Sequence, residues 1–245
     1  MKRILLTLLL LPGLLPPGLR AQERYDYEWY TAAAGIEAPV YRTRLAQTYE
    51  FPFNGTYRAD TLGFLNGTLW YGGKRYDHML LDIDARQQHL LVQYPGSPVV
   101  FDFGQERVER FDRGGIPYIN LRAAGLNVPE GFFEEICTGR GTVYRLMGKV
   151  IQQIQPGAPM ADIGYDDPHY RHEVLDYFSP KETWILLRED GSIFPLKRRN
   201  DFYKAFPAER KALRRKMSRL SETDADRASW TRAAMYYLIE MSHEK

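Results

Sequence analysis

A single polar segment gathers the residue types best suited to metal or acid–base chemistry. Within 166–173 the sequence places two histidines and three acids: Asp166, Asp167, His169, His172 and Glu173. His169 and His172 are three residues apart and could share one helix face, where imidazole and carboxylate groups suit zinc, calcium or manganese. Pro168 disrupts a regular helix, however, and Arg171 would repel a cation. We therefore favour a polar loop, and keep Asp167, His169 and His172 as the candidates for a metal or hydrolytic site.

Motifs for other catalytic classes are missing from the sequence. Ser97 lies between Gly96 and Pro98, so it lacks the second glycine and the following helix of a nucleophile elbow. The Gly139-Arg140-Gly141 segment lies between expected strands and opens no helix that could bind a phosphate. Cys137 is the only cysteine, which excludes an intramolecular disulfide and a cysteine pair for zinc. We expect Cys137 to be buried and unreactive, and the sequence predicts no catalytic residue, metal site or cofactor beyond the candidates above.

The first 21 residues have the pattern of a secretory signal peptide. Lys2 and Arg3 precede an apolar run, and several prolines and glycines follow it before a small residue at Ala21. The run is too short to span a bilayer as a stable anchor. We predict cleavage after Ala21, export to the periplasm or the cell surface, and no transmembrane segment after signal removal.

Removal of this leader changes the charge of the chain. The full chain carries 33 basic and 31 acidic residues, whereas the mature chain would carry 30 basic and 31 acidic ones. A nearly neutral exported protein is not expected to bind nucleic acid. Ten basic residues nevertheless face only two acids between Lys197 and Arg219. This run fits a solvated helix face, which we favour, or a surface for anionic lipid headgroups, acidic polysaccharide or a partner.

Residues 51–198 have the spacing expected of an antiparallel β domain. Short runs rich in aromatic and β-branched residues alternate with turn signals at intervals of roughly 8–12 residues. Gly72-Gly73 and Asp190-Gly191 are strong two-residue hairpin signals. Pro195 has no N–H to donate, so its strand should lie at an edge. We predict a mainly β fold, an antiparallel meander that forms a sandwich or a partly open barrel.

Two segments are expected to lie outside this meander. Residues 22–50 form an aromatic N-terminal segment containing Tyr25, Tyr27, Trp29 and Tyr30. We favour packing of these rings across the main domain over a role in docking a partner. Residues 156–182 contain Pro159, Pro168 and Pro180, and we expect them to leave the sheet as an irregular excursion before a strand resumes at Trp184.

Residues 199–245 are predicted to form a helical C-terminal segment. Asn200 or Asp201 is suited to cap a first short helix. Leu213, Met217 and Leu220 then recur at helical spacing. A longer apolar stripe follows, made of Trp230, Ala233, Ala234, Tyr237, Leu238 and Met241. These stripes predict helices that dock on the sheet or on one another.

Two stretches of this sequence resemble an uncharacterised family of secreted β-rich proteins from Bacteroidota-type bacteria. The first runs from Gly67 to Asp84 through the Gly72-Gly73 turn, and the second runs from Trp184 to Pro207 through a hairpin into a capped helix. The likeness covers about residues 65–220. Its motifs are turns, strand alternation and a helix cap, so it implies fold and export and no activity. Asp60-Thr61-Leu62 is also similar to a short O-glycosylation motif found in that group.

The sequence thus favours an exported, non-enzymatic binding or scaffold protein of the cell envelope, whose partner is an envelope protein or a glycan. The alternative is an envelope hydrolase acting on glycan or peptide, possibly metal-dependent. Its chemistry would come from a pair among the 31 acidic residues brought together by the fold, or from the segment that carries His169 and His172.

Overall fold

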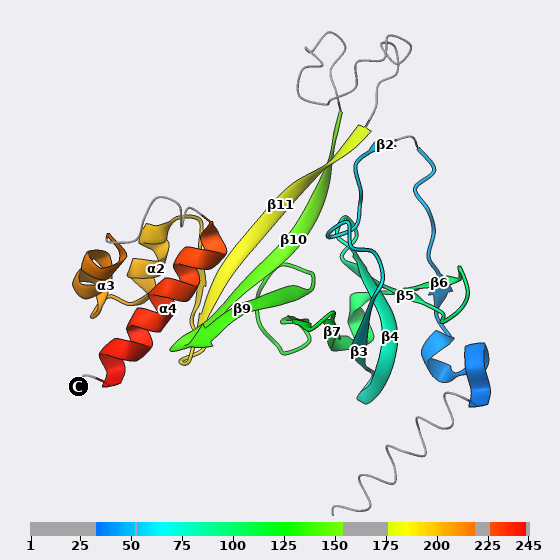
Figure 1. Cartoon of the computed structure of the whole chain (residues 1–245), viewed down its shortest axis with the longest axis horizontal. Coiled ribbons are helices and arrows are strands. Elements are labelled where there is room, and N and C mark those ends of the chain that lie inside the picture. The colour runs from blue at the N-terminus through cyan, green and yellow to red at the C-terminus, as the bar shows by residue number, and fades with distance from the viewer. Residues whose placement is uncertain (1–32, 52, 154–175, 219–225, 244–245) are drawn as a thin grey trace, which may run out of the picture. The chain divides into compact units, whose positions relative to one another are not determined.

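The computed structural model describes residues 33–51, 53–153, 176–218 and 226–243 (Figure 1). The chain divides into two units, Met1–Arg42 and Thr43–Lys245. In the described part of the first unit, two short 3-10 turns, η1 (Gly35–Glu37) and η2 (Pro39–Tyr41), follow one another. All of the sheet and the three C-terminal helices belong to the second unit.

The second unit is mainly β. Its strands, in chain order, are β1 (Arg44–Leu45), β2 (Phe53–Asn54), β3 (Leu65–Tyr71), β4 (Lys74–Asp84), β5 (His89–Gln93), β6 (Val100–Phe103), β7 (Val108–Arg113), β8 (Ile116–Ile119), β9 (Phe133–Gly139), β10 (Gly141–Gln153), β11 (Asp176–Arg188) and β12 (Ile193–Pro195). A 3-10 turn, η3 (Gln105–Arg107), joins β6 to β7. The prediction of a mainly β fold with a helical C-terminal appendage is confirmed.

The strands form one sheet that does not close. Its order is β1-β6-β5-β4-β3-β7-β8-β9-β10-β11-β12, and β2 adds to β11 off this path. Neighbours along the path are antiparallel, and only the β2–β11 pair is parallel among the described strands. Most hairpins pair strands that follow one another in the sequence, as expected. The exceptions are β1, which pairs with β6, β2, which pairs with β11, and β7, which returns past three strands to lie beside β3.

Turn chemistry sets the register of the β3–β4 hairpin. Gly72 and Gly73 both adopt positive φ angles, 58° and 76°, which an L-residue with a side chain rarely adopts. Trp70 therefore faces Arg75 across the hairpin. On the other side of β3, a Cβ atom at Gly67 would lie 1.8 Å from the carbonyl oxygen of Asp112, so only glycine allows β7 to approach this closely.

Residues 176–182, which we expected to leave the sheet, form the first half of β11. Pro180 pairs with Lys149 in an uninterrupted antiparallel register. Trp184, four residues on, accepts a hydrogen bond from Leu196 N on the side away from β10. By the two-residue alternation of a strand, the nitrogen of Pro180 also turns away from β10, so its missing N–H removes no bond of that ladder. Pro195 lies in β12, the terminal strand of the path, as its edge prediction requires.

A row of cross-strand neighbours crosses the middle of the sheet. It runs through Tyr76, Leu69, Phe111, Tyr118, Glu134, Arg145 and Trp184. The rings of Phe111 and Tyr118 stack with centroids 4.9 Å apart, and both side chains are buried. Beyond them the row turns polar, where Arg145 donates to Glu134.

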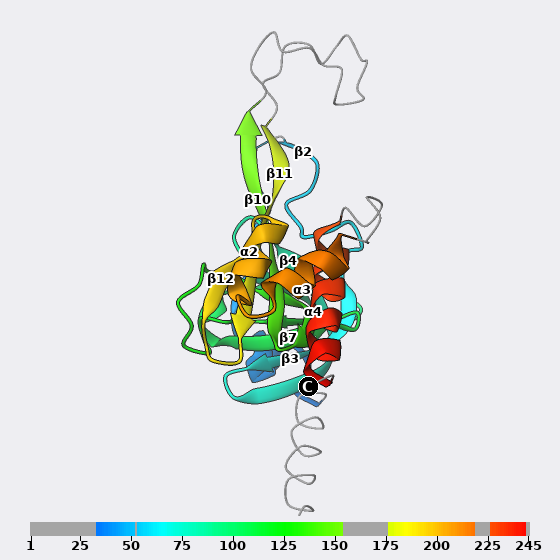
Figure 2. The same ribbon diagram turned by 90° about the vertical axis from the view of Figure 1, so that its left-hand side faces the viewer.

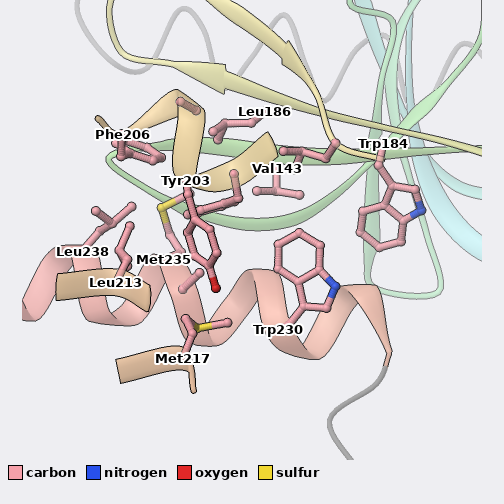
Figure 3. Packing of buried hydrophobic residues seen from close by; sticks show 14 of the residues in the cluster. Val143, Trp184, Leu186, Tyr203, Phe206, Leu213, Met217, Trp230, Met235 and Leu238 are labelled. Carbon is pink, nitrogen blue, oxygen red and sulfur yellow. The ribbon is translucent and has the colours of Figure 1, made fainter. Parts of the chain in front are cut away.

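Three helices pack at the β9–β12 end of the sheet, α2 (Arg199–Ala205), α3 (Arg210–Met217) and α4 (Arg227–His243). Figure 2 shows them beside one another. Asp201 caps α2 by accepting the N–H groups of Lys197 and Arg198. The predicted stripes are buried at Leu213, Met217, Trp230, Ala234 and Leu238. Figure 3 shows four of them, together with Tyr203 and Met235, between the helices and the strands that carry Val143 and Leu186; these four are Leu213, Met217, Trp230 and Leu238.

Candidate functional site

The most distinctive surface feature of the sheet is an indole ring between two arginines. Trp70 in β3 pairs with Arg75 of β4 on one side and with Arg110 of β7 on the other, so all three side chains share one face. The guanidinium carbon of Arg110 lies 3.9 Å from the indole ring centroid, and that of Arg75 lies 5.3 Å from it. We call Trp70, Arg75, Asp77 and Arg110 the Trp70 site.

Asp77 holds one of the two arginines in place. Its Oδ1 accepts a hydrogen bond from Arg75 Nε at 2.9 Å and another from Thr68 Oγ1 at 2.8 Å. The Arg75 charge is therefore neutralised within the site, and the arginine is held against the indole. Its side chain is 44 % exposed, whereas that of Asp77 is only 12 % exposed.

A strained backbone position adjoins Asp77. The β3–β4 register shifts between Gly67 and Leu69, where Asp77 and His78 oppose Thr68. The extra residue of this bulge is accommodated at His78, whose φ of 58° lies in the left-handed region that residues other than glycine rarely adopt. Asp77 follows Arg75 by two residues, so the alternation of the strand places it on the face of Trp70 beside this bulge. Such strain at an exposed residue is typical of functional surfaces.

Arg110 is the charged group of the site that remains available. Its side chain is exposed and stacked on Trp70, and within the described ranges no carboxylate forms an ion pair with it. Stacking on an aromatic ring leaves the in-plane N–H donors of a guanidinium free and limits its motion. These donors match the two oxygens of a carboxylate or a sulfate ester.

The largest buried charge cluster of the sheet is already paired. The fully buried Arg113 donates to both Asp60 oxygens at 2.8 and 2.9 Å and lies 3.2 Å from Asp82, which Arg58 also contacts at 2.8 Å. Burial raises the pKa of Asp82 despite these two cations. Burial alone would raise the pKa of Asp60 as well, but the hydrogen bonds from Arg113 and the Leu62 N–H, together with the Arg113 charge, outweigh it and lower that pKa. The cluster stabilises the fold and offers no free reactive group.

A second pair of carboxylates is bridged by one arginine. Arg145 donates to Glu134 through Nε at 3.0 Å and Nη2 at 2.6 Å, and its Nη1 reaches Glu182 at 3.5 Å. Trp184 donates its indole N–H to Glu182 at 2.8 Å. A hydrolytic pair needs one carboxyl that is free to donate or accept a proton. Both carboxylates here are engaged by the protein itself.

His89 and Asp102 form an acid–histidine pair that binds Arg44 of strand β1. Arg44 Nη2 lies 2.9 Å from His89 Nδ1 and 2.9 Å from an Asp102 oxygen. His89 Nδ1 also lies 3.1 Å from Asp102 Oδ2, and which of these two contacts is a hydrogen bond depends on the tautomer of the ring. Oδ1 of Asp102 is buried without a hydrogen-bond partner. Arg44 contacts both side chains and so attaches β1 to β5 and β6.

The candidates from the sequence fall in different places. Asp167, His169 and His172 lie outside the described residues, as do the rings of Tyr25, Tyr27, Trp29 and Tyr30. In the parts of the chain that are described, no group of three or more His, Cys, Asp or Glu residues is placed to hold a metal ion. Cys137 is half-buried, and burial raises the pKa of its thiol to about 11, in keeping with the expected unreactive state.

Sequence reasoning missed the Trp70 site. The sequence predicts the hairpin turn that places Trp70 opposite Arg75, so this half of the site could be predicted. The position of Arg110 could not be predicted, because β7 reaches β3 by a return connection and not by pairing with its neighbour in the sequence.

Comparison with known proteins gave no relative. No protein-family model matches the chain. Neither a curated protein nor a solved structure matches it. Among the described helices, none has both the length and the apolar character needed to cross a membrane.

Proposed function

We propose that this chain is an exported, non-enzymatic binding protein of the cell envelope that recognises an acidic glycan at the Trp70 site. The observation that carries the proposal is the exposed guanidinium of Arg110, stacked 3.9 Å from the Trp70 ring centroid and without a carboxylate partner among the described residues. Export is supported by the leader pattern of residues 1–21, and by the resemblance to secreted proteins.

The chemistry of the site favours an acidic sugar over a neutral one. A uronate carboxylate would accept two hydrogen bonds from the edge of Arg110. The parts of the indole that Arg110 and Arg75 leave uncovered would contact the apolar face of a sugar ring. The Thr68 hydroxyl donates to Asp77 and lies on the same face of the sheet. Its oxygen would accept a hydrogen bond from a sugar hydroxyl. Asp77 neutralises the charge of Arg75, so the net positive charge of the site is that of Arg110.

The test measures binding of polygalacturonate, with the same polymer after reduction of its carboxyl groups as the neutral control. We expect the full chain to bind the acidic polymer and not the reduced one. Arg110→Gln should weaken the affinity at least about tenfold, because a charge-assisted bidentate contact is lost. Arg110→Lys should recover little of it, because an ammonium cannot form the planar fork.

Arg86→Gln is the matched control, since Arg86 is exposed and lies in the turn after β4, away from the Trp70 site. Its affinity should equal that of the unmodified chain. Equal binding of acidic and reduced polymer, or full affinity in the Arg110→Gln variant, would refute the assignment. Failure of the unmodified chain to bind the acidic polymer would refute it as well.

The export component has its own test. N-terminal sequencing of the protein recovered from periplasmic and extracellular fractions should give Gln22 as the first residue. An intact leader on protein that remains in the cytosol would contradict export, whatever the result with the glycan.

A further inference from the structure

A concentrated basic surface lies on helix α3, away from the Trp70 site. Arg210, Lys211, Arg214 and Arg215 are all exposed, and their spacing places them on one side of the helix. Leu213 and Met217 of the same helix are buried and hold it against the core (Figure 3). The packing of α3 therefore leaves these four positions facing solvent. We call them the α3 basic face.

The neighbouring acids do not neutralise this face. Glu209 is paired with Arg140 at 2.6 Å, and Asp201 with Lys204 at 3.0 Å. Glu240 of the adjacent α4 is paired with Lys216. Within the described residues, no carboxylate forms an ion pair with any member of the α3 basic face.

The face extends onto the start of α2. Arg214 Nη2 donates to Asn200 Oδ1 at 2.8 Å, which places the middle of α3 within side-chain reach of the first turn of α2. Arg198, at the N-cap position of α2, is exposed and adds to the positive charge at this end. Five unneutralised basic side chains thus lie on two packed helices.

The kind of partner follows from what the surface lacks. A glycan site presents a partly accessible ring and polar groups that recognise hydroxyls, as the Trp70 site does with its half-buried indole. On α2 and α3 the aromatic side chains Phe202, Tyr203 and Phe206 are buried, and the amide of Asn200 is already bonded to Arg214. What remains is diffuse positive charge on a rigid support, which matches the diffuse negative charge of a lipid headgroup layer.

We propose that the α3 basic face docks the protein onto a membrane surface rich in anionic phospholipid headgroups. The contact is electrostatic and peripheral, since α3 buries its apolar side in the protein core. This proposal does not depend on glycan binding at the Trp70 site. It gives the chain a second surface, so that glycan and membrane could be bound together.

The experiment is co-sedimentation of the full chain with vesicles. Vesicles of phosphatidylglycerol and phosphatidylcholine are compared with vesicles of phosphatidylcholine alone. We expect binding only to the anionic vesicles, and loss of that binding at high salt, because screening shortens the range of the attraction. A Lys211→Ala/Arg215→Ala variant should partition roughly thirtyfold less strongly, as expected when two basic residues near an anionic surface are lost.

A Lys181→Ala/Arg86→Ala variant is the matched control, because it removes the same net charge from exposed positions outside α2 and α3. It should retain most of the binding, and both variants should melt at the temperature of the unmodified chain. Equal loss in the two variants would show that net charge alone acts and would overturn the proposal. So would binding to neutral vesicles, no binding to either vesicle, or tighter binding of dextran sulfate than of vesicles through the same two residues.

Discussion

Arg113 and Asp82 form an ion pair in which both side chains are fully buried, with Nη2 of the arginine 3.2 Å from Oδ1 of the aspartate. Asp60 completes the cluster from the segment before β3 and binds the same guanidinium through both of its oxygens. The cluster thereby links the segment before β3 with strands β4 and β7.

Removal of Arg113 should leave a buried carboxylate poorly compensated. Arg113→Met is expected to lower the free energy of unfolding by about 3–5 kcal/mol, the usual effect of removing one partner of a buried pair. Urea denaturation followed by tryptophan fluorescence measures this change. Arg215→Ala, at an exposed position, should change it by no more than about 0.5 kcal/mol. A loss below about 1 kcal/mol in Arg113→Met would mean that the pair contributes little.

The Asp60 carboxyl should make stability depend on acid pH. Its pKa is lowered below 3.8, so its contribution is present above that pH and is lost as the pH falls through the folded-state pKa. Asp60→Asn should lower the free energy of unfolding by about 1–2 kcal/mol at neutral pH, allowing for its partial exposure. Denaturation at a series of pH values should show the two proteins converging below pH 3.8. A constant difference down to the lowest pH would contradict this assignment.

Cys137 should resist modification in the native protein. Burial raises the pKa of its thiol from 9.0 to about 11, so the thiolate is rare near neutral pH. A thiol reagent at pH 8 should therefore label the native chain far more slowly than the unfolded chain. Because the folded-state pKa is the higher one, the contribution of the thiol to stability is full below pH 9.0 and falls as the pH rises toward 11. Cys137→Ala should show a shallower decline over that range, and an identical decline would contradict the assignment.

His78 should carry measurable backbone strain. Its φ of 58° is readily adopted by glycine, so His78→Gly is expected to raise the free energy of unfolding by up to about 1 kcal/mol. Asn66→Gly, at an exposed position of the neighbouring strand, should lower it by about 0.5–1 kcal/mol. Thermal and urea unfolding of the two variants provide the comparison. Destabilisation of equal size in both would show that the bulge is not strained at His78.

Local sequence signals determined the elements of this protein to a large extent. Gly72-Gly73 set the β3–β4 register, Pro195 marked an edge strand, and the spacing of Leu213, Met217, Trp230 and Leu238 gave the buried sides of α3 and α4. These features depend on backbone conformation and on one-dimensional periodicity, which neighbouring residues carry. Pro180 misled the prediction because a proline can remain in a strand when its nitrogen faces away from the ladder.

Tertiary structure alone decided which charges are satisfied and which remain available. Asp60, Asp82 and Arg113 look like ordinary polar residues of strands and turns until the fold buries them together. Arg110 reaches Trp70 only because β7 returns to lie beside β3. Pairing between distant strands depends on the summed packing of the whole sheet, and no local pattern encodes it. The candidate site is for that reason a property of the fold, built on a hairpin that the sequence itself specifies.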